Sequence, residues 1–210
     1  MAGLRLEALR PRVLEPVSLD LEAGELVLIS GPSGSGKSLL LRAIADLDPH
    51  EGQVWLDGEP RSSMAAHLWR RRVGLLPAES FWWEDRVGPH FPEDAADPQA
   101  LPDLLGALGF GPEVLDWSVS RLSTGERQRL ALARLLAQAP EVLLLDEATA
   151  NLDPANRDRV ESAVARYRGT HAAATLWVSH DPEQRERLTA QGGARQLVIR
   201  DGRLEPWPWA

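Results

Sequence analysis

Cysteine is absent from this chain of 210 residues. Without thiols the protein can form neither a disulfide framework nor a thiolate metal site, and its composition is compatible with a reducing compartment. Long apolar segments are missing too. The N-terminus lacks the apolar stretch of a signal peptide, and an apolar run such as residues 142–145 is far shorter than the roughly 20 residues of a membrane span. We therefore expect the chain to be soluble by itself.

Negative charge exceeds positive charge, with 31 acidic against 23 basic residues. The formal net charge is −8 at pH 7, whereas nucleic-acid-binding domains usually carry a basic surface, so we expect no nucleic acid among the partners. Lysine is nearly missing: of the 23 basic residues, Lys37 is the one lysine and the others are arginines. The length fits one domain of ordinary size, with a sizeable core and room for a subdomain.

The single lysine lies in a glycine-rich segment, residues 31–38, whose sequence GPSGSGKS matches the phosphate-binding pattern GxxxxGK(S/T). An apolar, β-branched run at 25–30 precedes it and a helical pattern at 38–45 follows, which is the context that a phosphate loop requires. Glycines let successive N–H groups point at phosphate oxygens, and the helix N-terminus adds its positive dipole end. A lysine ammonium fits such a cradle as a point charge, whereas the planar fork of arginine is too wide.

The residues of this segment that we expect to bind nucleotide phosphates are Gly31, Ser33, Gly34, Ser35, Gly36, Lys37 and Ser38. The hydroxyl of Ser38 would also bind Mg²⁺, as the serine or threonine of this pattern does. The simpler alternative is a glycine- and serine-rich turn before an ordinary helix. Against it, every fixed position of the pattern is matched in the right context.

The first part of the chain predicts antiparallel strands. Apolar and polar residues alternate over residues 4–28, as in strands with one face on the core and one in water. Asp57 and Gly58 follow another apolar run and predict a hairpin turn. Residues 78–120 differ in composition, because five prolines and several acidic clusters surround a helical pattern at 101–108. We expect this stretch to form an inserted, loop-rich helical subdomain.

After Ser123 the pattern returns to alternating helices and strands. Leucines and alanines recur at helical spacing over residues 127–139, and the apolar runs at 142–145 and 174–178 are typical of buried parallel strands. A short strand pair at 195–204, turned at an Asp-Gly pair, closes the pattern. Strands that alternate with helices predict an α/β fold with a mostly parallel sheet and helices on both faces.

Two carboxylates directly follow the first of these apolar runs. Asp146 and Glu147 come after residues 142–145, and the carboxyl ends of the strands are where α/β sheets bind ligands. Asp146 is placed to hold Mg²⁺, as the corresponding aspartate does in phosphoryl-transfer proteins, and Glu147 is placed to accept a proton from an attacking water. The simpler interpretation is that both acids begin a helix and interact with its dipole. The lysine loop in the same chain weighs against it.

A histidine follows the second apolar run. His180 comes after residues 174–178 and Ser179, which again puts a polar side chain at the carboxyl end of a strand, where it could reach a terminal phosphate. A histidine at such a position is otherwise often a surface residue. The other four histidines have no comparable neighbours in the sequence, and we assign them no role.

These segments, in this order, resemble the ATPase subunits of ATP-binding cassette (ABC) transporters over essentially the whole chain. The most specific part is LSTGE at residues 122–126, which looks like the family signature LSGGQ with Thr124 and Glu126 as departures. Residues 150–153, ANLD, resemble the D-loop, and His180 resembles the switch histidine. A phosphate loop alone would leave kinases, GTPases and helicases open, but the ordered set is specific.

The resemblance implies an α/β, P-loop NTPase (RecA-like) core over residues 1–77 and 126–210, with an N-terminal antiparallel β subdomain. Residues 78–125 would be the helical subdomain with the signature motif. Among subfamilies, the short length and the loop near Phe81 look most similar to small bacterial ATPase subunits of iron exporters.

The resemblance also implies a mechanism. Two cassettes pack head to tail, and each ATP is held between the phosphate loop of one and the signature of the other, through Ser123 and the backbone of Gly125. Asp153 of the D-loop belongs to the same nucleotide site, with Glu147 and His180 as the catalytic residues. The implied cofactors are ATP and Mg²⁺, the metal ligands being Ser38 and Asp146.

Partners and location follow from the same resemblance. Hydrolysis would open the dimer and drive a separate transmembrane permease, so the implied partners are ATP, a second copy of the chain and that permease. The protein would be cytoplasmic and peripheral to the inner face of the cell membrane. Three adjacent aromatic residues at 81–83 are hard to bury together and predict an exposed surface for the permease. The alternative is that they pin their loop to the helical subdomain.

Two positions depart from the family. An aromatic residue normally stacks on adenine from the N-terminal β region, where this chain has Arg-Pro-Arg at 10–12; arginine can also stack on a base. In the loop at 73–79, which resembles the Q-loop, Ala78 replaces the glutamine that would touch Mg²⁺ and relay the nucleotide state to the helical subdomain. Glu79 is the neighbour that could substitute for it.

Two other functions stay open. A regulatory module that dimerises on ATP with very low turnover is compatible with the loss at position 78, although Glu147 and His180 argue against it. A soluble ABC ATPase acting on DNA or ribosomes usually carries coiled-coil arms or a second cassette, and neither fits in 210 acidic residues.

Overall fold

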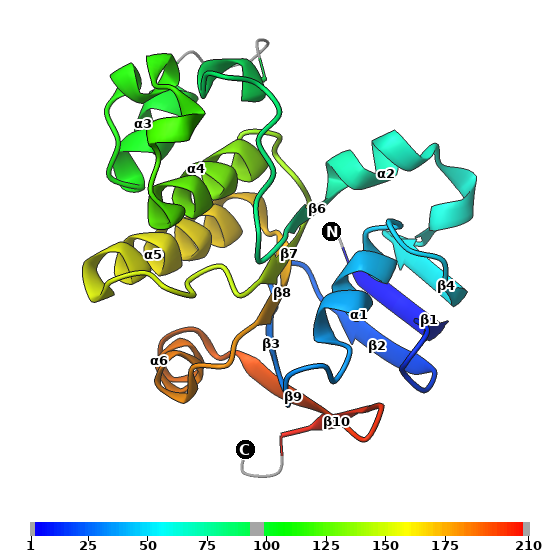
Figure 1. Ribbon diagram of the computed structural model, residues 1–210. Coiled ribbons are helices and arrows are strands. Elements are labelled where there is room, and N and C mark those ends of the chain that lie inside the picture. Colours follow the sequence, from blue (N-terminus) through cyan, green and yellow to red (C-terminus); the bar gives the residue numbers. More distant parts are fainter. Residues whose placement is uncertain (1–2, 93–98, 208–210) are drawn as a thin grey trace.

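Two sheets form the framework of the protein, whose residues 3–92 and 99–207 are described by a computed structural model (Figure 1). In the larger sheet the strands lie in the order β10 (Arg203–Pro206), β9 (Arg195–Arg200), β3 (Leu26–Ser30), β8 (Ala174–Val178), β7 (Val142–Asp146) and β6 (Val73–Leu76). Neighbours in this sheet pair in parallel except β10, which returns antiparallel to β9. The predicted mostly parallel sheet and the closing strand pair are confirmed.

The central strands are mostly apolar because both faces of the sheet are covered. Every residue of β3, β7 and β8 is buried. Side chains along β7 alternate between two cores, so that Val142 and Leu144 enter one core while Leu143 and Leu145 enter the other. The first core contains α1 (Lys37–Ile44) and the smaller sheet, and the second contains α4 (Thr124–Leu136), α5 (Pro154–His171) and α6 (Pro182–Gly192). The prediction of helices on both faces is confirmed, and Figure 1 shows α1 and α5 on opposite sides of the sheet.

The smaller sheet is antiparallel, in the order β2 (Val17–Leu21), β1 (Leu4–Arg10), β4 (Glu51–Leu56) and β5 (Glu59–Pro60). The hairpin turn predicted at Asp57 and Gly58 is confirmed, with φ of 52° and 77° at these residues. The antiparallel prediction for 4–28 is wrong at its end, because residues 26–28 belong to β3 in the parallel sheet. Those residues are apolar at every position, not at every second one, which is the pattern of a strand buried on both faces.

The stretch before the signature is loop-rich and helical, as predicted, although residues 93–98 within it lie outside the described residues. It contains α3 (Ala100–Ala107) and the short 3₁₀ helices η2 (Gly88–His90), η3 (Pro112–Asp116) and η4 (Val119–Arg121). Helix α4 begins at Thr124, earlier than the predicted residue 127, because Ser123 caps its N-terminus. It ends before the predicted residue 139, since Ala139 has a positive φ of 51°.

Some elements were not anticipated. Helix α2 (Ala66–Arg72), the short η1 (Arg61–Ser63) and α6 have no strong pattern in the sequence. Helix α6 nevertheless has a readable start, because the Asp181 side chain accepts a hydrogen bond from the Glu183 N–H and Pro182 occupies the first turn. Residues 1–2 and 208–210, the ends of the predicted core, lie outside the described residues.

The order of the strands sets the position of the site. Because β3, β8 and β7 are parallel neighbours, their carboxyl ends lie side by side, and the segments that leave them carry Lys37, His180 and Glu147. Within the described residues, the helices are all too short or too polar to cross a membrane.

Candidate functional site

The loop between β3 and α1 is shaped by its glycines. Gly31 has a φ of 144°, and a Cβ at this position would lie 2.4 Å from the carbonyl oxygen of Ile199. Gly36 caps α1 in the left-handed conformation, with a φ of 101°, and a Cβ there would lie 2.8 Å from the Leu14 side chain. Any larger residue at either position would push the loop away from the structure that supports it.

Lys37 folds back over this loop. Its Nζ donates hydrogen bonds to the carbonyl oxygens of Gly31 at 3.0 Å and Pro32 at 2.8 Å. An ammonium has three N–H donors, so one is left for a ligand. Burial lowers the pKa of Lys37, while Glu147 and Asp146 oppose this shift. A phosphate above the loop would supply the negative charge that the buried ammonium favours.

Two serines of the loop also suit a phosphate. The Ser35 hydroxyl is buried and has no hydrogen-bond partner among the described residues, which is unusual for a buried polar group. Ser33 and Gly34 are exposed at the tip of the loop. The site therefore has an unpartnered hydroxyl and an accessible backbone, and both fit the group that the sequence pattern predicts.

Asp146, the last residue of β7, is only 6% exposed. Burial raises the pKa of its carboxyl, and a hydrogen bond from the Ser38 hydroxyl opposes this shift. Ser38 and Asp146 thus present adjacent oxygen donors, the ligand type that Mg²⁺ prefers. Within residues 3–92 and 99–207 no group of three or more His, Cys, Asp or Glu side chains could hold a metal ion. A magnesium ion bound here would take its remaining ligands from nucleotide phosphates and water.

Glu147 and His180 meet across two neighbouring strands. His180 Nε2 lies 3.0 Å from Glu147 Oε1, although 33 positions separate them in the numbering of the sequence. The Glu147 N–H donates to the carbonyl of Val178 at 3.1 Å, and Glu147 has a positive φ of 51°, a conformation that is rare for a residue with a side chain. The next helix, α5, begins only at Pro154, so the interpretation that the two acids begin a helix is wrong.

One cavity of about 200 Å³ brings most of these groups together. It is lined by Ser33, Gly34, Gly36, Lys37, Ser38, Leu39, Glu147 and His180. The cationic and hydroxyl groups come from the loop and α1, and the acid–histidine pair comes from the ends of β7 and β8. This arrangement can hold phosphate oxygens on one side and a proton acceptor on the other.

The signature segment lies elsewhere. Ser123 caps α4 through a capping box, in which its Oγ accepts from the Glu126 N–H at 3.3 Å and Glu126 Oε2 accepts from the Ser123 N–H at 2.8 Å. These bonds lower the pKa of Glu126. They also explain why Glu is accepted at this position of the signature, because a capping box requires Glu or Gln there.

The D-loop residues lie beside the signature. A Cβ on Gly125 would be 3.1 Å from the Leu152 side chain, and Asp153 caps α5 by accepting a hydrogen bond from the Asn156 N–H at 3.0 Å. Ser123, Gly125 and Asp153 do not line the phosphate-loop cavity. In Figure 1 the helical part with α3 and α4 is well separated from α1. A single chain therefore does not bring its own signature to its own phosphate loop.

The loop after β6 contains Ala78, at the position where the family resemblance predicts a glutamine. Ala78 and Glu79 are both exposed. One residue earlier, the carbonyl of Pro77 accepts a hydrogen bond at 3.3 Å from Gln128, a buried residue of α4. Gln128, to which the sequence reasoning gave no role, thus connects this loop to the signature helix.

The three aromatic residues divide between exposure and packing. Phe81 is 77% and Trp83 is 67% exposed, whereas Trp82 is half-buried against the core of the helical part. Arg134 of α4 lies over the rings of Trp82 and Trp83 at 4.8 and 4.9 Å, and donates to the Phe81 carbonyl at 3.0 Å. The structure thus shows exposure of Phe81 and Trp83 and packing of Trp82, while the permease contact stays a prediction.

His90, to which the sequence gave no role, organises this loop. Its buried ring accepts hydrogen bonds at Nε2 from the N–H groups of Trp83 at 3.0 Å and Glu84 at 3.1 Å. Nδ1 lies 3.0 Å from the carbonyl of Arg86 and 3.2 Å from that of Val87, so this nitrogen carries the proton. A neutral His90 ring thus supports, through hydrogen bonds to the backbone, the segment that carries the exposed aromatic residues.

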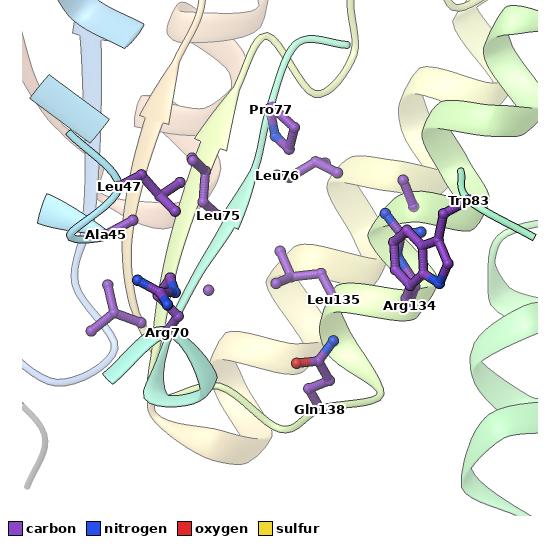
Figure 2. Close-up of a pocket in the computed structure, with 13 residues that line it drawn as sticks. Ala45, Leu47, Arg70, Leu75, Leu76, Pro77, Trp83, Arg134, Leu135 and Gln138 are labelled. Carbon is purple, nitrogen blue, oxygen red and sulfur yellow. The ribbon is translucent and has the colours of Figure 1, made fainter. Parts of the chain in front are cut away.

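A second cavity, of about 240 Å³, lies next to these aromatic residues (Figure 2). Leu47 and Arg70 line one side, and Trp83 and Arg134 line the other. Leu75, on β6, lies between them. The cavity therefore separates the α1–α2 side of the molecule from the signature helix.

The expected adenine position has no aromatic residue. Residues 10–12 lead into a turn that brings Val13 against the phosphate loop, since a Cβ on Gly36 would lie 3.0 Å from Val13 Cγ2. Val13 is an exposed large apolar residue. The exposed group beside the loop is thus aliphatic.

Comparison with known sequences points to one family. The ABC transporter family matches residues 14–150. The protein STAR1 of Oryza sativa subsp. japonica is 38% identical over 191 residues, which cover 88% of this chain and 55% of STAR1. The probable iron export ATP-binding protein FetA of Escherichia coli K12 is 35% identical over 180 residues, which cover 82% of this chain and 80% of FetA. The chain thus spans little more than half of the rice protein and most of the bacterial one.

Known structures share the fold. A dimeric ATP-binding cassette in a post-hydrolysis state, bound to ADP and Pi, is similar with a TM-score of 0.80. The similarity covers 97% of this chain and 98% of that one at 23% identity. It confirms the predicted fold class.

The position of Lys37 leads to a first prediction. A guanidinium cannot fit between two carbonyls at 2.8 and 3.0 Å and still face a phosphate. We expect Lys37→Arg to lower the affinity for ATP with Mg²⁺ at least about tenfold, or about 1.4 kcal/mol, as measured by isothermal titration calorimetry. Arg42→Lys, on the same helix but paired with Asp48, is the matched control and should bind as the unmodified protein does. Unchanged affinity of Lys37→Arg would refute the tight-cradle argument.

Proposed function

The chain belongs to the ABC transporter family as one of its ATPases, and on this premise we propose that it is the ATP-hydrolysing subunit of a membrane transporter. The observation that carries the proposal is the 3.0 Å contact between Glu147 and His180 at the rim of the phosphate-loop cavity. Glu147 accepts a proton from the attacking water. His180 orients Glu147 and faces the terminal phosphate.

The other site residues have binding roles in this proposal. The phosphates of ATP are bound by Gly31, Ser33, Gly34, Ser35, Gly36, Lys37 and Ser38. Mg²⁺ is bound by Ser38 and Asp146 and, when present, neutralises the phosphate charge. The buried carboxyl of Asp146 and the unpartnered hydroxyl of Ser35 support these roles.

A second copy of the chain completes the site. The separation of the signature from the phosphate loop supports a head-to-tail dimer, in which Ser123, Gly125 and Asp153 of one copy face the nucleotide of the other. A serine hydroxyl at the N-terminus of a helix, such as that of Ser123 on α4, is suited to an anion. In this dimer the nucleotide lies between the two copies, so that binding favours association and hydrolysis favours separation.

The partner that uses this cycle is a transmembrane permease. The exposed Phe81 and Trp83, beside a cavity that also presents Arg70 and Arg134, support a docking surface on this side of the protein. The protein would then lie at the cytoplasmic face of a membrane. We also propose the division into a nucleotide-binding core, residues 1–77 and 126–210, and a helical subdomain, residues 78–125.

One observation favours a second candidate function, a regulatory module that dimerises on ATP and turns it over very slowly. Ala78 carries no group that could touch Mg²⁺ or water, and its side chain is exposed. Glu79, also exposed, is the nearest group that could take its place. The intact pair of Glu147 and His180 supports the ATPase over this candidate.

Glu147→Gln tests the proposed function. The amide cannot accept a proton from water, so ATP should still bind while hydrolysis stops and the ATP-bound dimer accumulates. Steady-state phosphate release and size-exclusion chromatography with and without ATP measure these effects. A variant that keeps full activity, or stays monomeric with ATP, contradicts the assignment.

Ala78 leads to a prediction that separates the two functions. If the missing glutamine slows hydrolysis through poor positioning, Ala78→Gln should raise kcat, by up to about a hundredfold for a correction on the order of 1 Å, with nearly unchanged ATP affinity. If Glu79 has taken over, Glu79→Ala should be severely damaging and Ala78→Gln nearly silent. ATPase rates of both single variants decide between these cases. No effect in either variant means that the loop has no role in hydrolysis.

The docking surface is tested with its exposed residues. Phe81→Ala combined with Trp83→Ala should abolish co-purification with the integral membrane partner, identified by mass spectrometry, while ATP binding is kept. Leu68→Ala, which removes an exposed large apolar residue of α2, is the matched control. If the double variant loses its folded structure instead, the aromatic residues serve the loop and not a partner.

A further inference from the structure

A buried amide lies behind the contact of Glu147 and His180 and has no part in the proposed mechanism. Gln184, near the start of α6, is 1% exposed. Its Oε1 accepts a hydrogen bond from the Ser179 hydroxyl at 2.6 Å. Its Nε2 donates to Thr149 Oγ1 at 2.9 Å and to Glu161 Oε1 at 3.0 Å. A glutamine is seldom buried so completely, and here both ends of the amide are satisfied.

The partners of Gln184 connect it to both halves of the catalytic pair. Ser179 directly precedes His180, and its Oγ also accepts a hydrogen bond from the N–H of Asp181 at 3.2 Å. The two residues that flank the histidine are thus bonded to each other. Thr149 belongs to the turn that carries Glu147. The amide of Gln184 therefore spans from the segment of His180 to the turn of Glu147.

The rest of the network makes this bridge rigid. Glu161 of α5 is held by Arg187 at 3.0 Å, and Arg185 donates to the carbonyl of Ser179 at 3.3 Å. Ser179, Gln184 and Arg185 are all buried. Buried hydrogen bonds are strong in a low dielectric, and a network that loses one member leaves other polar groups unpaired.

We infer that Gln184 is a positioning residue for ATP hydrolysis, whose amide holds Ser179 and Thr149 together and so sets the contact between His180 and Glu147. This inference rests on the proposed function of that pair. Gln184 does not line the nucleotide cavity, so its loss should change the chemical step and not the binding of ATP. The expected signature is a lower kcat with an almost unchanged KM and ATP affinity.

The test exchanges an amide and a carboxylate across the contact of Gln184 and Glu161. In Gln184→Glu the two N–H donors disappear and two carboxylates face each other at a distance set by the present 3.0 Å bond. We expect kcat to fall at least about tenfold, with KM changed less than about twofold. Adding Glu161→Gln returns a donor and an acceptor to the same contact, and should restore kcat to within about threefold of the unmodified protein.

A control at another buried contact of helix α6 accounts for general loss of structure. Gln196→Glu removes a similar bond, from Gln196 Nε2 to Thr189 Oγ1 at 2.9 Å, which joins β9 to α6 away from Ser179. Its kcat should match that of the unmodified protein. Thermal unfolding and ATP titration accompany each variant. If Gln184→Glu does not fold, Thr149→Val, which removes one bond of the bridge, should still lower kcat several-fold at unchanged KM.

Each outcome is decisive. If the unmodified protein hydrolyses ATP and folded Gln184→Glu, or Thr149→Val in its place, keeps kcat within about twofold, the inference is overturned and the proposed function stands. If the double variant binds ATP normally but does not recover, the donor–acceptor argument is overturned. If the unmodified protein does not hydrolyse ATP, or Glu147→Gln remains fully active, the proposed function fails and the inference falls with it.

Discussion

The parallel hydrogen bonding of β3, β8 and β7 is the constraint on which the rest of this structure depends. It aligns the three carboxyl ends, so that one edge of the sheet holds the phosphate loop, the histidine and the two acids. Side chains of these strands alternate between two apolar cores, one on each face, which bury the sheet on both sides. Substitutions within these cores would therefore affect the site indirectly, by shifting the strands that support it.

Stability and function oppose each other at this edge. Burial lowers the pKa of Lys37 and raises that of Asp146, so each charged form is disfavoured without a ligand. Glu147 also occupies a backbone conformation that is unfavourable for a side-chain-bearing residue. A phosphate and a divalent cation would favour the charged forms of both groups. The site is thus suited to charged ligands at some expense to the folded state, as is common at functional sites.

The departures from the family have different physical meanings. Glu126 is a capping residue, and its carboxylate makes the bond that the capping box requires. Ala78 has no polar side-chain group, yet Gln128 connects the adjoining Pro77 to the signature helix. His90 and Gln184 are buried polar groups, and their side chains form hydrogen bonds to the segment of Trp83 and to the turn of Glu147, respectively. For Glu126, His90 and Gln184, the hydrogen-bond partners explain the position.

The sequence alone determined the features that rest on local order. The phosphate loop needs only consecutive glycines and a lysine between a strand and a helix, and the buried strands 142–145 and 174–178 show as continuous apolar runs. The start of α4 was predicted too late because its capping box was not recognised in the sequence. Helix α2 was not predicted, since its segment has no strong hydrophobic periodicity. Only the tertiary structure brought Glu147 within 3.0 Å of His180 and kept the signature away from its own phosphate loop. Only the fold also gave Gln184 a bond to the segment of His180 and another to the turn of Glu147. Such contacts depend on which strands become neighbours, and no residue pattern along one segment contains that information.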